Sequence, residues 1–104
     1  MFVHAVYFWL RADLTGEEHS RFIEGVRSLT TIESVERAYV GQPAPTDRAI
    51  IERGYSTGLI VVFRDQAAHD RYQVDPIHDR FREACSTFWD KVVIYDTISD
   101  ASAA

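Results

Sequence analysis

The chain has 104 residues, of which 46% are hydrophobic and 26% charged, a composition typical of a globular protein rather than a disordered one. Lys and Arg number 11 against 16 Asp and Glu, and the net charge of -5 argues against a nucleic-acid partner because phosphate binding needs clustered basic residues. A single cysteine rules out an intrachain disulfide and favours a cytoplasmic location, and no apolar run is long enough to cross a membrane.

The first predicted element is a strand over residues 2–10, which is dense in aromatic and β-branched side chains. Both of its faces are apolar, with Phe2, Val6, Phe8 and Leu10 alternating with Val3, Ala5, Tyr7 and Trp9. A sheet covered by helices on one side normally keeps its other side polar. The second apolar face therefore predicts another protein surface packed against it.

A helix is predicted over residues 16–29, because Thr15 and Glu18 have the spacing of a capping box. A second strand over residues 35–41 and a third over residues 55–63 follow, the latter again apolar on both faces. The loop between them, residues 42–54, contains two prolines. Ile50 and Ile51 interrupt this loop and could cover a sheet edge or reach a partner.

The second half of the chain predicts a short helix capped by Asp65 and ending near Tyr72. Asp75 followed by Pro76 then starts a further helix, since proline is well suited to the first helical position. A fourth strand is predicted over residues 91–98. We expect one domain over residues 1–98 and a flexible tail over residues 99–104.

This order of elements predicts an α+β fold, a ferredoxin-like βαββαβ sandwich with a four-stranded antiparallel sheet and helices on one face. The uncovered face would carry apolar residues such as Tyr7, Trp9, Ile60 and Tyr95. Monomers rarely expose an apolar patch of this kind. Two copies packed through their sheet faces would hide it, so we expect a homodimer that closes a dimeric α/β barrel.

Four segments resemble the stress-responsive dimeric A/B barrel (Dabb) family. They are the first strand with its early His4, residues 54–56, residues 67–81 with a Tyr followed by Pro-x-His and Phe, and residues 88–92. The similarity covers residues 2–97. It implies the same fold and a homodimer.

One branch of that family is formed by plant polyketide cyclases of the olivetolic acid cyclase type, which need no cofactor. The resemblance implies aldol-type chemistry by Tyr72 and His78, with His4 lining the same pocket. Val26 stands near a position where those cyclases have a pocket Tyr, which points to a different substrate. Another branch contains plant stress proteins with no assigned chemistry.

The residues themselves indicate the same candidates. His78 would lie in the first turn of its helix, where the helix dipole opposes a positive charge, so a neutral imidazole could act as a general base. Tyr72 could orient it or donate to a substrate oxygen. The alternative for His78, Tyr72 and His4 is a structural role. The predicted apolar walls, which also resemble an ordinary core, are Val6, Phe8, Phe22, Val26, Phe81, Phe88, Trp89 and Ile94.

We expect neither a metal ion nor a cofactor. The acidic and histidine residues between His69 and Asp79 do not have the spacing of an established zinc or calcium motif. His19 and His69 are expected to be solvated helix residues, and Cys85 a small buried hydrophobic residue.

Three functions remain open from the sequence. The first is a cofactor-independent cyclase or lyase that acts on a small hydrophobic carbonyl or polyketide-like ligand. The second is a non-catalytic homodimer that responds to stress or binds a ligand. The third is haem binding through a histidine axial ligand, for which we find no specific motif.

Overall fold

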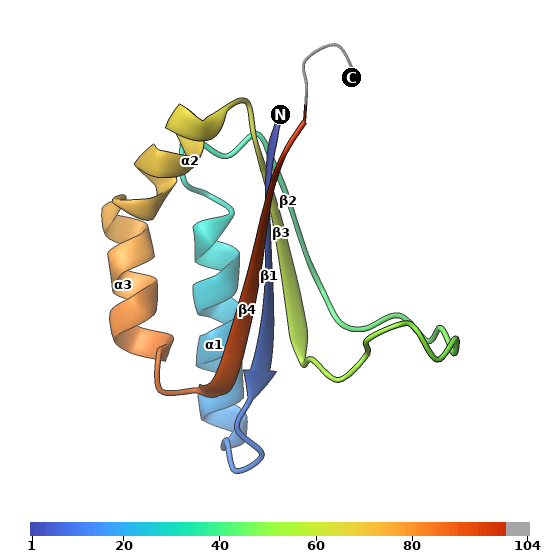
Figure 1. Cartoon of the computed structure of the whole chain (residues 1–104). Coiled ribbons are helices and arrows are strands. Elements are labelled where there is room, and N and C mark those ends of the chain that lie inside the picture. Colours follow the sequence, from blue (N-terminus) through green and yellow to red (C-terminus); the bar gives the residue numbers. More distant parts are fainter. Residues whose placement is uncertain (100–104) are drawn as a thin grey trace.

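The computed structural model describes residues 1–99, which form a four-stranded antiparallel sheet with helices on one face only (Figure 1). The strand order is β2-β3-β1-β4, as expected for a ferredoxin-like sandwich. The elements are β1 (Phe2–Leu10), α1 (Gly16–Leu29), β2 (Arg37–Gly41), β3 (Thr57–Phe63), α2 (Gln66–Gln73), α3 (Pro76–Cys85) and β4 (Trp89–Ile98). None of the described helices is both long and apolar enough to span a bilayer.

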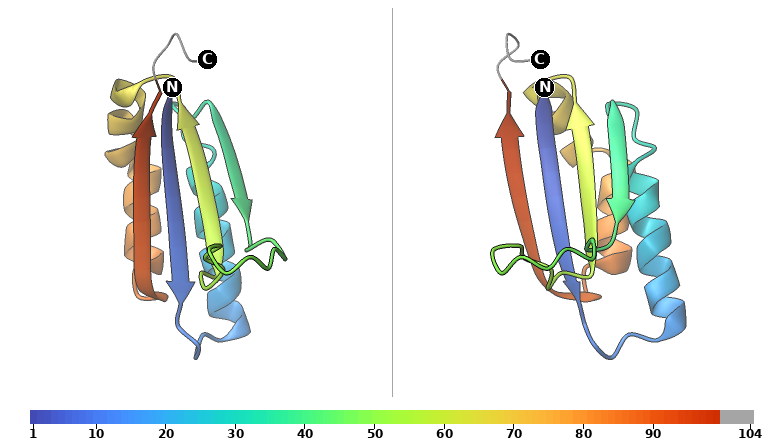
Figure 2. Two further views of the ribbon diagram at one scale, coloured as in Figure 1. Left: turned by 45° about the vertical axis from the view of Figure 1, so that its right-hand side comes forward. Right: turned by 90° about the vertical axis from the view of Figure 1, so that its right-hand side faces the viewer.

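The central strand β1 pairs with β3 on one side and with β4 on the other. Burial alternates along β1 as the sequence predicts: Phe2, His4, Val6 and Phe8 are buried under the helices. The intervening residues, Val3, Ala5, Tyr7 and Trp9, are only half-buried, and the alternation of a strand places them on the other face of the sheet. Figure 2 shows that no helix covers that face. The sheet therefore has one face in the core of the chain and one apolar face outside it.

Three strands begin at positions that differ from the prediction. β2 starts at Arg37 instead of residue 35, because the Val35 amide donates to the Ile32 carbonyl in a turn. β3 starts at Thr57 instead of residue 55. Its preceding residue, Ser56, still contacts the end of β1 through a backbone hydrogen bond to Phe8 of 2.7 Å. β4 extends back to Trp89, with an irregular register beside Leu10.

The helix starts follow the predicted caps. The Thr15 hydroxyl accepts from the Glu18 amide at 3.1 Å, and the Glu18 carboxylate accepts from the Thr15 amide at 3.0 Å. Asp65 caps α2, and Asp75 caps α3 by accepting from the Ile77 amide at 2.8 Å. The interruption at residues 74–75 places the last turn of α2 beside the first turn of α3.

Ser99, the first residue of the expected tail, is among the described residues. The Ser99 amide donates to the Met1 carbonyl at 2.9 Å, so Ser99 continues the contact between β4 and the start of β1. The rest of the expected tail, residues 100–104, lies outside the described residues.

Candidate active site

A cavity of about 330 Å³ lies between the inner face of the sheet and the helices α2 and α3. All three predicted polar residues line it: His4 from β1, Tyr72 from α2 and His78 from α3. Five of the predicted wall residues line it as well, Val6, Phe8, Phe81, Trp89 and Ile94. The fold thus brings residues from distant parts of the chain to one mostly apolar space.

Phe22, Val26 and Phe88, the other three predicted wall residues, do not line this cavity. They are buried in the core, where Phe22 packs edge-on against the Phe8 ring at 5.1 Å between centroids. Phe22 therefore contacts the cavity wall residue Phe8 without lining the cavity itself. The sequence pattern could not distinguish a wall residue from a core residue, because both are apolar and face inward.

Tyr72 and His78 lie next to each other across the break between α2 and α3. Their ring centroids are 5.1 Å apart, and the Tyr72 ring also contacts His4 at 5.7 Å. Tyr72 therefore contacts both histidines. The Nδ1 atom of His78 is buried and has no hydrogen-bond partner among the described residues.

His4 is held by a carboxylate that the sequence had not indicated. Its Nδ1 atom lies 2.5 Å from Asp96 Oδ1, across the β1–β4 pair in which these two residues face each other. His4 is 3% exposed, so this contact satisfies a buried polar ring. A hydrogen bond between an Asp and one ring nitrogen determines whether the other nitrogen of the imidazole is protonated.

Burial sets the protonation of the site. Desolvation raises the pKa of the Tyr72 phenol well above its usual range, so this hydroxyl is a hydrogen-bond donor at neutral pH. Desolvation lowers the pKa of His78, and the positive Arg82 and nearby His4 lower it further against the opposing charges of Asp79 and Asp75. Desolvation also lowers the pKa of His4, with Asp96 opposing. Both imidazoles therefore favour the neutral form.

Several cavity residues were not predicted: Leu29, Leu59, Gln73, Arg82 and Val92. Arg82 follows His78 by four residues, so helical spacing places both on one face of α3. That spacing is a signal that could have identified Arg82. Asp96, in contrast, contacts His4 only through the strand register, which the sequence alone does not determine.

The prediction that His69 is a solvated helix residue is wrong. It is 8% exposed, because α2 packs over the sheet and the Phe2 ring stacks on the imidazole at 4.3 Å between centroids. His19 is exposed, as predicted, and Cys85 is buried. His69, His4 and Asp96 form a group whose ligand atoms lie within 4.8 Å of one another, close enough to hold a metal ion.

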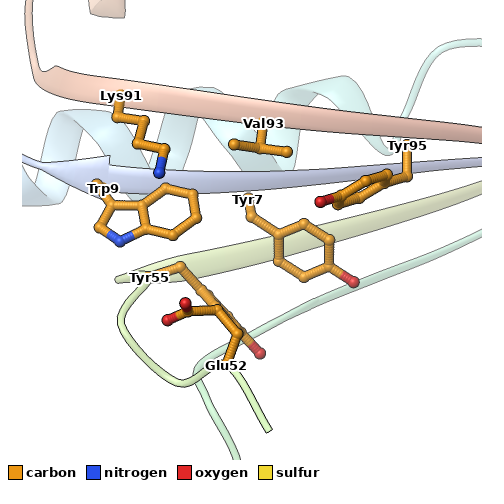
Figure 3. A pocket seen from close by; sticks show the side chains of 7 residues that line it. All are labelled: Tyr7, Trp9, Glu52, Tyr55, Lys91, Val93 and Tyr95. Carbon is orange, nitrogen blue, oxygen red and sulfur yellow. The ribbon is translucent and has the colours of Figure 1, made fainter. Parts of the chain in front are cut away.

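A second cavity, of about 380 Å³, lies on the opposite face of the sheet (Figure 3). Figure 3 shows the rings of Trp9, Tyr7 and Tyr95 along the strands, with Glu52 and Tyr55 from the loop region beside them. The Lys91 ammonium lies 4.5 Å from the centroid of the Trp9 ring, a cation–π contact. This cavity is part of the outer apolar face and carries no histidine.

The comparisons with known proteins agree with this architecture. The sequence model of the stress-responsive A/B barrel domain family matches residues 2–99. The chain belongs to this family. A comparison with curated proteins finds no match.

Among solved structures, a Dabb family protein with a ferredoxin-like fold from Mesorhizobium loti has a TM-score of 0.76 at 24% identity, covering 96% of this chain and 97% of its own. Hydroxynitrile lyase from Passiflora edulis has a TM-score of 0.77 at 19% identity, covering 96% and 94%. A dimeric ferredoxin-like protein of unknown function from Thermobifida fusca has a TM-score of 0.75 at 14% identity, covering 94% and 90%. At these identities the likeness shows the shared fold.

Proposed function

We propose that this Dabb protein is a homodimeric, cofactor-independent enzyme with a cyclase or lyase activity. It removes a proton from the carbon next to the carbonyl group of a small hydrophobic molecule. The observation that supports this most is the convergence of His4, Tyr72 and His78 on one cavity with apolar walls. A few polar groups in an apolar cavity are the usual composition of a small-molecule site.

In this mechanism His78 is the general base. Its neutral imidazole takes a proton from the carbon next to the substrate carbonyl, which leaves an enolate and an imidazolium. The lowered pKa of His78 keeps the base unprotonated at neutral pH. The imidazolium later returns the proton, either to the same carbon or to the alkoxide oxygen formed when the enolate attacks a second carbonyl.

Tyr72 and His4 have supporting roles. The Tyr72 hydroxyl donates a hydrogen bond to the enolate oxygen, and such a donor stabilises charge that develops in the transition state. It stays protonated because burial raises its pKa. His4, fixed by Asp96, contacts the Tyr72 ring in a T-shaped arrangement and positions it.

The dimensions of the cavity favour a small ligand. A volume of about 330 Å³ is at the lower end of the range of known ligand sites, about 300–1,000 Å³. The walls from Phe8, Phe81 and Trp89 are aromatic, and the Phe81 and Trp89 rings stack at 5.8 Å between centroids. We therefore propose an aromatic or otherwise flat carbonyl compound as the substrate class.

The outer face of the sheet supports the homodimer. Tyr95 is 63% exposed there, next to Tyr7 and near the half-buried Trp9. The loop between β2 and β3 projects from the same side (Figure 1), and it carries Ile50, which is 82% exposed. A second copy packed face to face would cover this surface and receive the projecting loop. The Thermobifida fusca protein, described as dimeric, shares the fold.

The Passiflora edulis relative supports the enzyme class, since its name assigns lyase activity to a protein of the same fold. Fold alone does not transfer a reaction, so the site residues must carry the proposal. The resemblance to polyketide cyclases that is seen in the sequence stays a prediction.

The test is the exchange of the methyl protons of aryl methyl ketones in D₂O, followed by proton NMR. The wild-type protein should accelerate this exchange, and His78→Gln should reduce the acceleration at least about 100-fold, the usual contribution of a general base. His19→Gln, an exposed histidine on α1, is the matched control and should exchange at the wild-type rate.

Two outcomes would contradict the proposal. One is wild-type exchange no faster than that of folded His78→Gln for every ketone. If the ketones nevertheless bind in the cavity, this result would support a non-catalytic ligand-binding homodimer. The other is a loss of exchange in His19→Gln as large as that in His78→Gln, which would mean that the acceleration does not depend on the position of His78.

A further inference from the structure

We propose that His4, His69 and Asp96 bind one divalent ion of a first-row transition metal, such as Zn²⁺. The three residues come from β1, α2 and β4, and their ligand atoms lie within 4.8 Å of one another. They meet where α2 covers the end of the sheet at which β1 begins and β4 ends (Figure 1). The inference shares His4 and Asp96 with the proposed active site, but it rests on the geometry of the donors and not on the proposed reaction.

The donor set determines the class of ion. Two imidazoles and one carboxylate suit Zn²⁺, Co²⁺, Ni²⁺ or Fe²⁺, whereas Mg²⁺ and Ca²⁺ prefer oxygen ligands. Three protein ligands with a remaining open position are typical of zinc sites that are not purely structural. The Asp96 side chain is 39% exposed, which gives an ion a path from solvent.

The distances between the donors fit an ion after a small adjustment. Asp96 Oδ1 lies 2.5 Å from His4 Nδ1, and Asp96 Oδ2 lies 4.0 Å from His69 Nε2. Bonds of about 2.1 Å at tetrahedral angles place ligand atoms about 3.4 Å apart. The separation between His4 and Asp96 must therefore widen by about 1 Å, and the widest donor separation, which is at most 4.8 Å, must shorten by up to about 1.4 Å. A rotation of the Asp96 carboxylate, together with small shifts of the two histidine rings, would bring the donors to these separations.

A further contact outside the three ligands supports the site. Asp70 Oδ1 lies 3.1 Å from His69 Nδ1, so this nitrogen carries the proton and Nε2 is left with a lone pair on the Asp96 side. A carboxylate on the far nitrogen of a histidine is the usual arrangement around metal-bound imidazoles. The Gln73 amide now lies 3.1 Å from the same Nε2 and would turn aside when an ion binds.

The two rings are also held in position before an ion arrives. Phe2 stacks on His69 at 4.3 Å between centroids, and Phe63 lies in a T-shaped arrangement with each of the two histidines. Both histidines are buried, unlike the members of an ordinary surface cluster. Little ordering entropy is lost on binding when the ligands are already fixed in place.

The experiment is isothermal titration calorimetry of the full chain without a polyhistidine tag. We expect one Zn²⁺ per chain, and Co²⁺ in place of Zn²⁺ should give visible d–d absorption bands of a low-symmetry site. His69→Gln and Asp96→Asn should each weaken Zn²⁺ binding at least about 100-fold, and Asp70→Asn about 10- to 100-fold, the usual effect of an outer partner. Mg²⁺ should give no comparable binding.

His19→Gln is the matched control, since it removes an exposed histidine on another helix and should keep the wild-type affinity. Circular dichroism of each variant checks that the chain is folded, and the exposed side of Asp70 makes its variant the least disruptive of the set. Wild-type affinity in folded Asp70→Asn and Asp96→Asn, equal weakening in His19→Gln, or no stoichiometric Zn²⁺ binding by the wild type would each overturn the proposal.

Discussion

The His78 imidazole lies among charges of both signs at the start of α3. Burial, Arg82 and His4 lower its pKa from the ordinary value of 6.5, while Asp79 and Asp75 raise it. The lowering effects dominate, so the base is neutral at pH 7 and becomes protonated only as the pH falls below 6.5. The proposed exchange activity should therefore decline on the acidic side with an apparent pKa below 6.5.

Arg82 offers a test of this cause. Its replacement by Ala removes a positive charge that disfavours the imidazolium, so the acidic limb of the pH–rate profile should move to higher pH. Arg80→Ala is the matched control, because Arg80 is exposed on the same helix and does not line the cavity. A limb that stays in place in Arg82→Ala, or moves equally in both variants, would show that Arg82 does not tune His78.

Among single residues, the site residues that could be predicted from the sequence are those close to the break between α2 and α3. His78 and Tyr72 flank the Asp75–Pro76 signal, whose local geometry is fixed by the sequence itself. Asp96 was missed because it reaches His4 through strand pairing over 92 residues. His69 was predicted to be a solvated helix residue, whereas its surroundings are decided by how α2 packs on Phe2.

Among the elements, the start of α3 positions the proposed base. Asp75→Ala removes the cap that accepts from the Ile77 amide, which should lower the free energy of unfolding by about 1 kcal/mol in urea denaturation. Looser positioning of His78 should also reduce exchange activity several-fold. Thr15→Ala, which removes the cap of α1, should lower the free energy of unfolding by a similar amount and leave activity unchanged. Equal activity in the two variants would contradict a positioning role for this cap.

The contact between α1 and α3 makes a second prediction. A methyl group at Gly25 would lie 2.8 Å from Cys85 Sγ and 3.0 Å from the Phe81 ring, both of which are buried. Gly25→Ala should therefore destabilise the protein by about 1–3 kcal/mol through overpacking, despite the better helix propensity of Ala. Gly16→Ala, with open space around it, should show no such loss in the same urea titration. If Gly25→Ala were as stable as the wild type, α1 and α3 would have to pack less closely than the 2.8 Å contact implies.

The elements themselves were predictable because their signals are local. Capping pairs and alternating apolar residues marked α1 and β1 at their observed bounds. The starts of β2 and β3 were less accurate. There the ends of strands depend on turn hydrogen bonds, such as the one from Val35 to Ile32, and these leave no mark in the apolar pattern.

For the whole molecule, the apolar outer face predicts association. Tyr95→Asp would place an unpaired carboxylate in the proposed interface and should weaken the dimer at least about 100-fold, as measured by sedimentation equilibrium. Val74→Asp is the matched control, because Val74 is at least as exposed to solvent in the single chain but caps α2 on the helical side. A wild-type monomer at high concentration, or equal effects of both changes, would contradict association through the sheet.

The layers of the molecule could be derived from strands that are apolar on both sides. The cavity could not be derived from the sequence. Val26 is packed in the core and Phe8 lines the cavity, but both are apolar residues that face inward, so residue type does not show which of them borders an empty space. The proposed chemistry therefore depends on this cavity more than on any single residue.

The most direct test is a crystal structure of the protein with a bound aryl methyl ketone such as acetophenone. We expect the ketone in the cavity between Phe81 and the sheet, with its oxygen facing the Tyr72 hydroxyl and its methyl group facing His78. A cavity closed by side chains, or a ketone bound instead on the outer face beside Trp9, would contradict it.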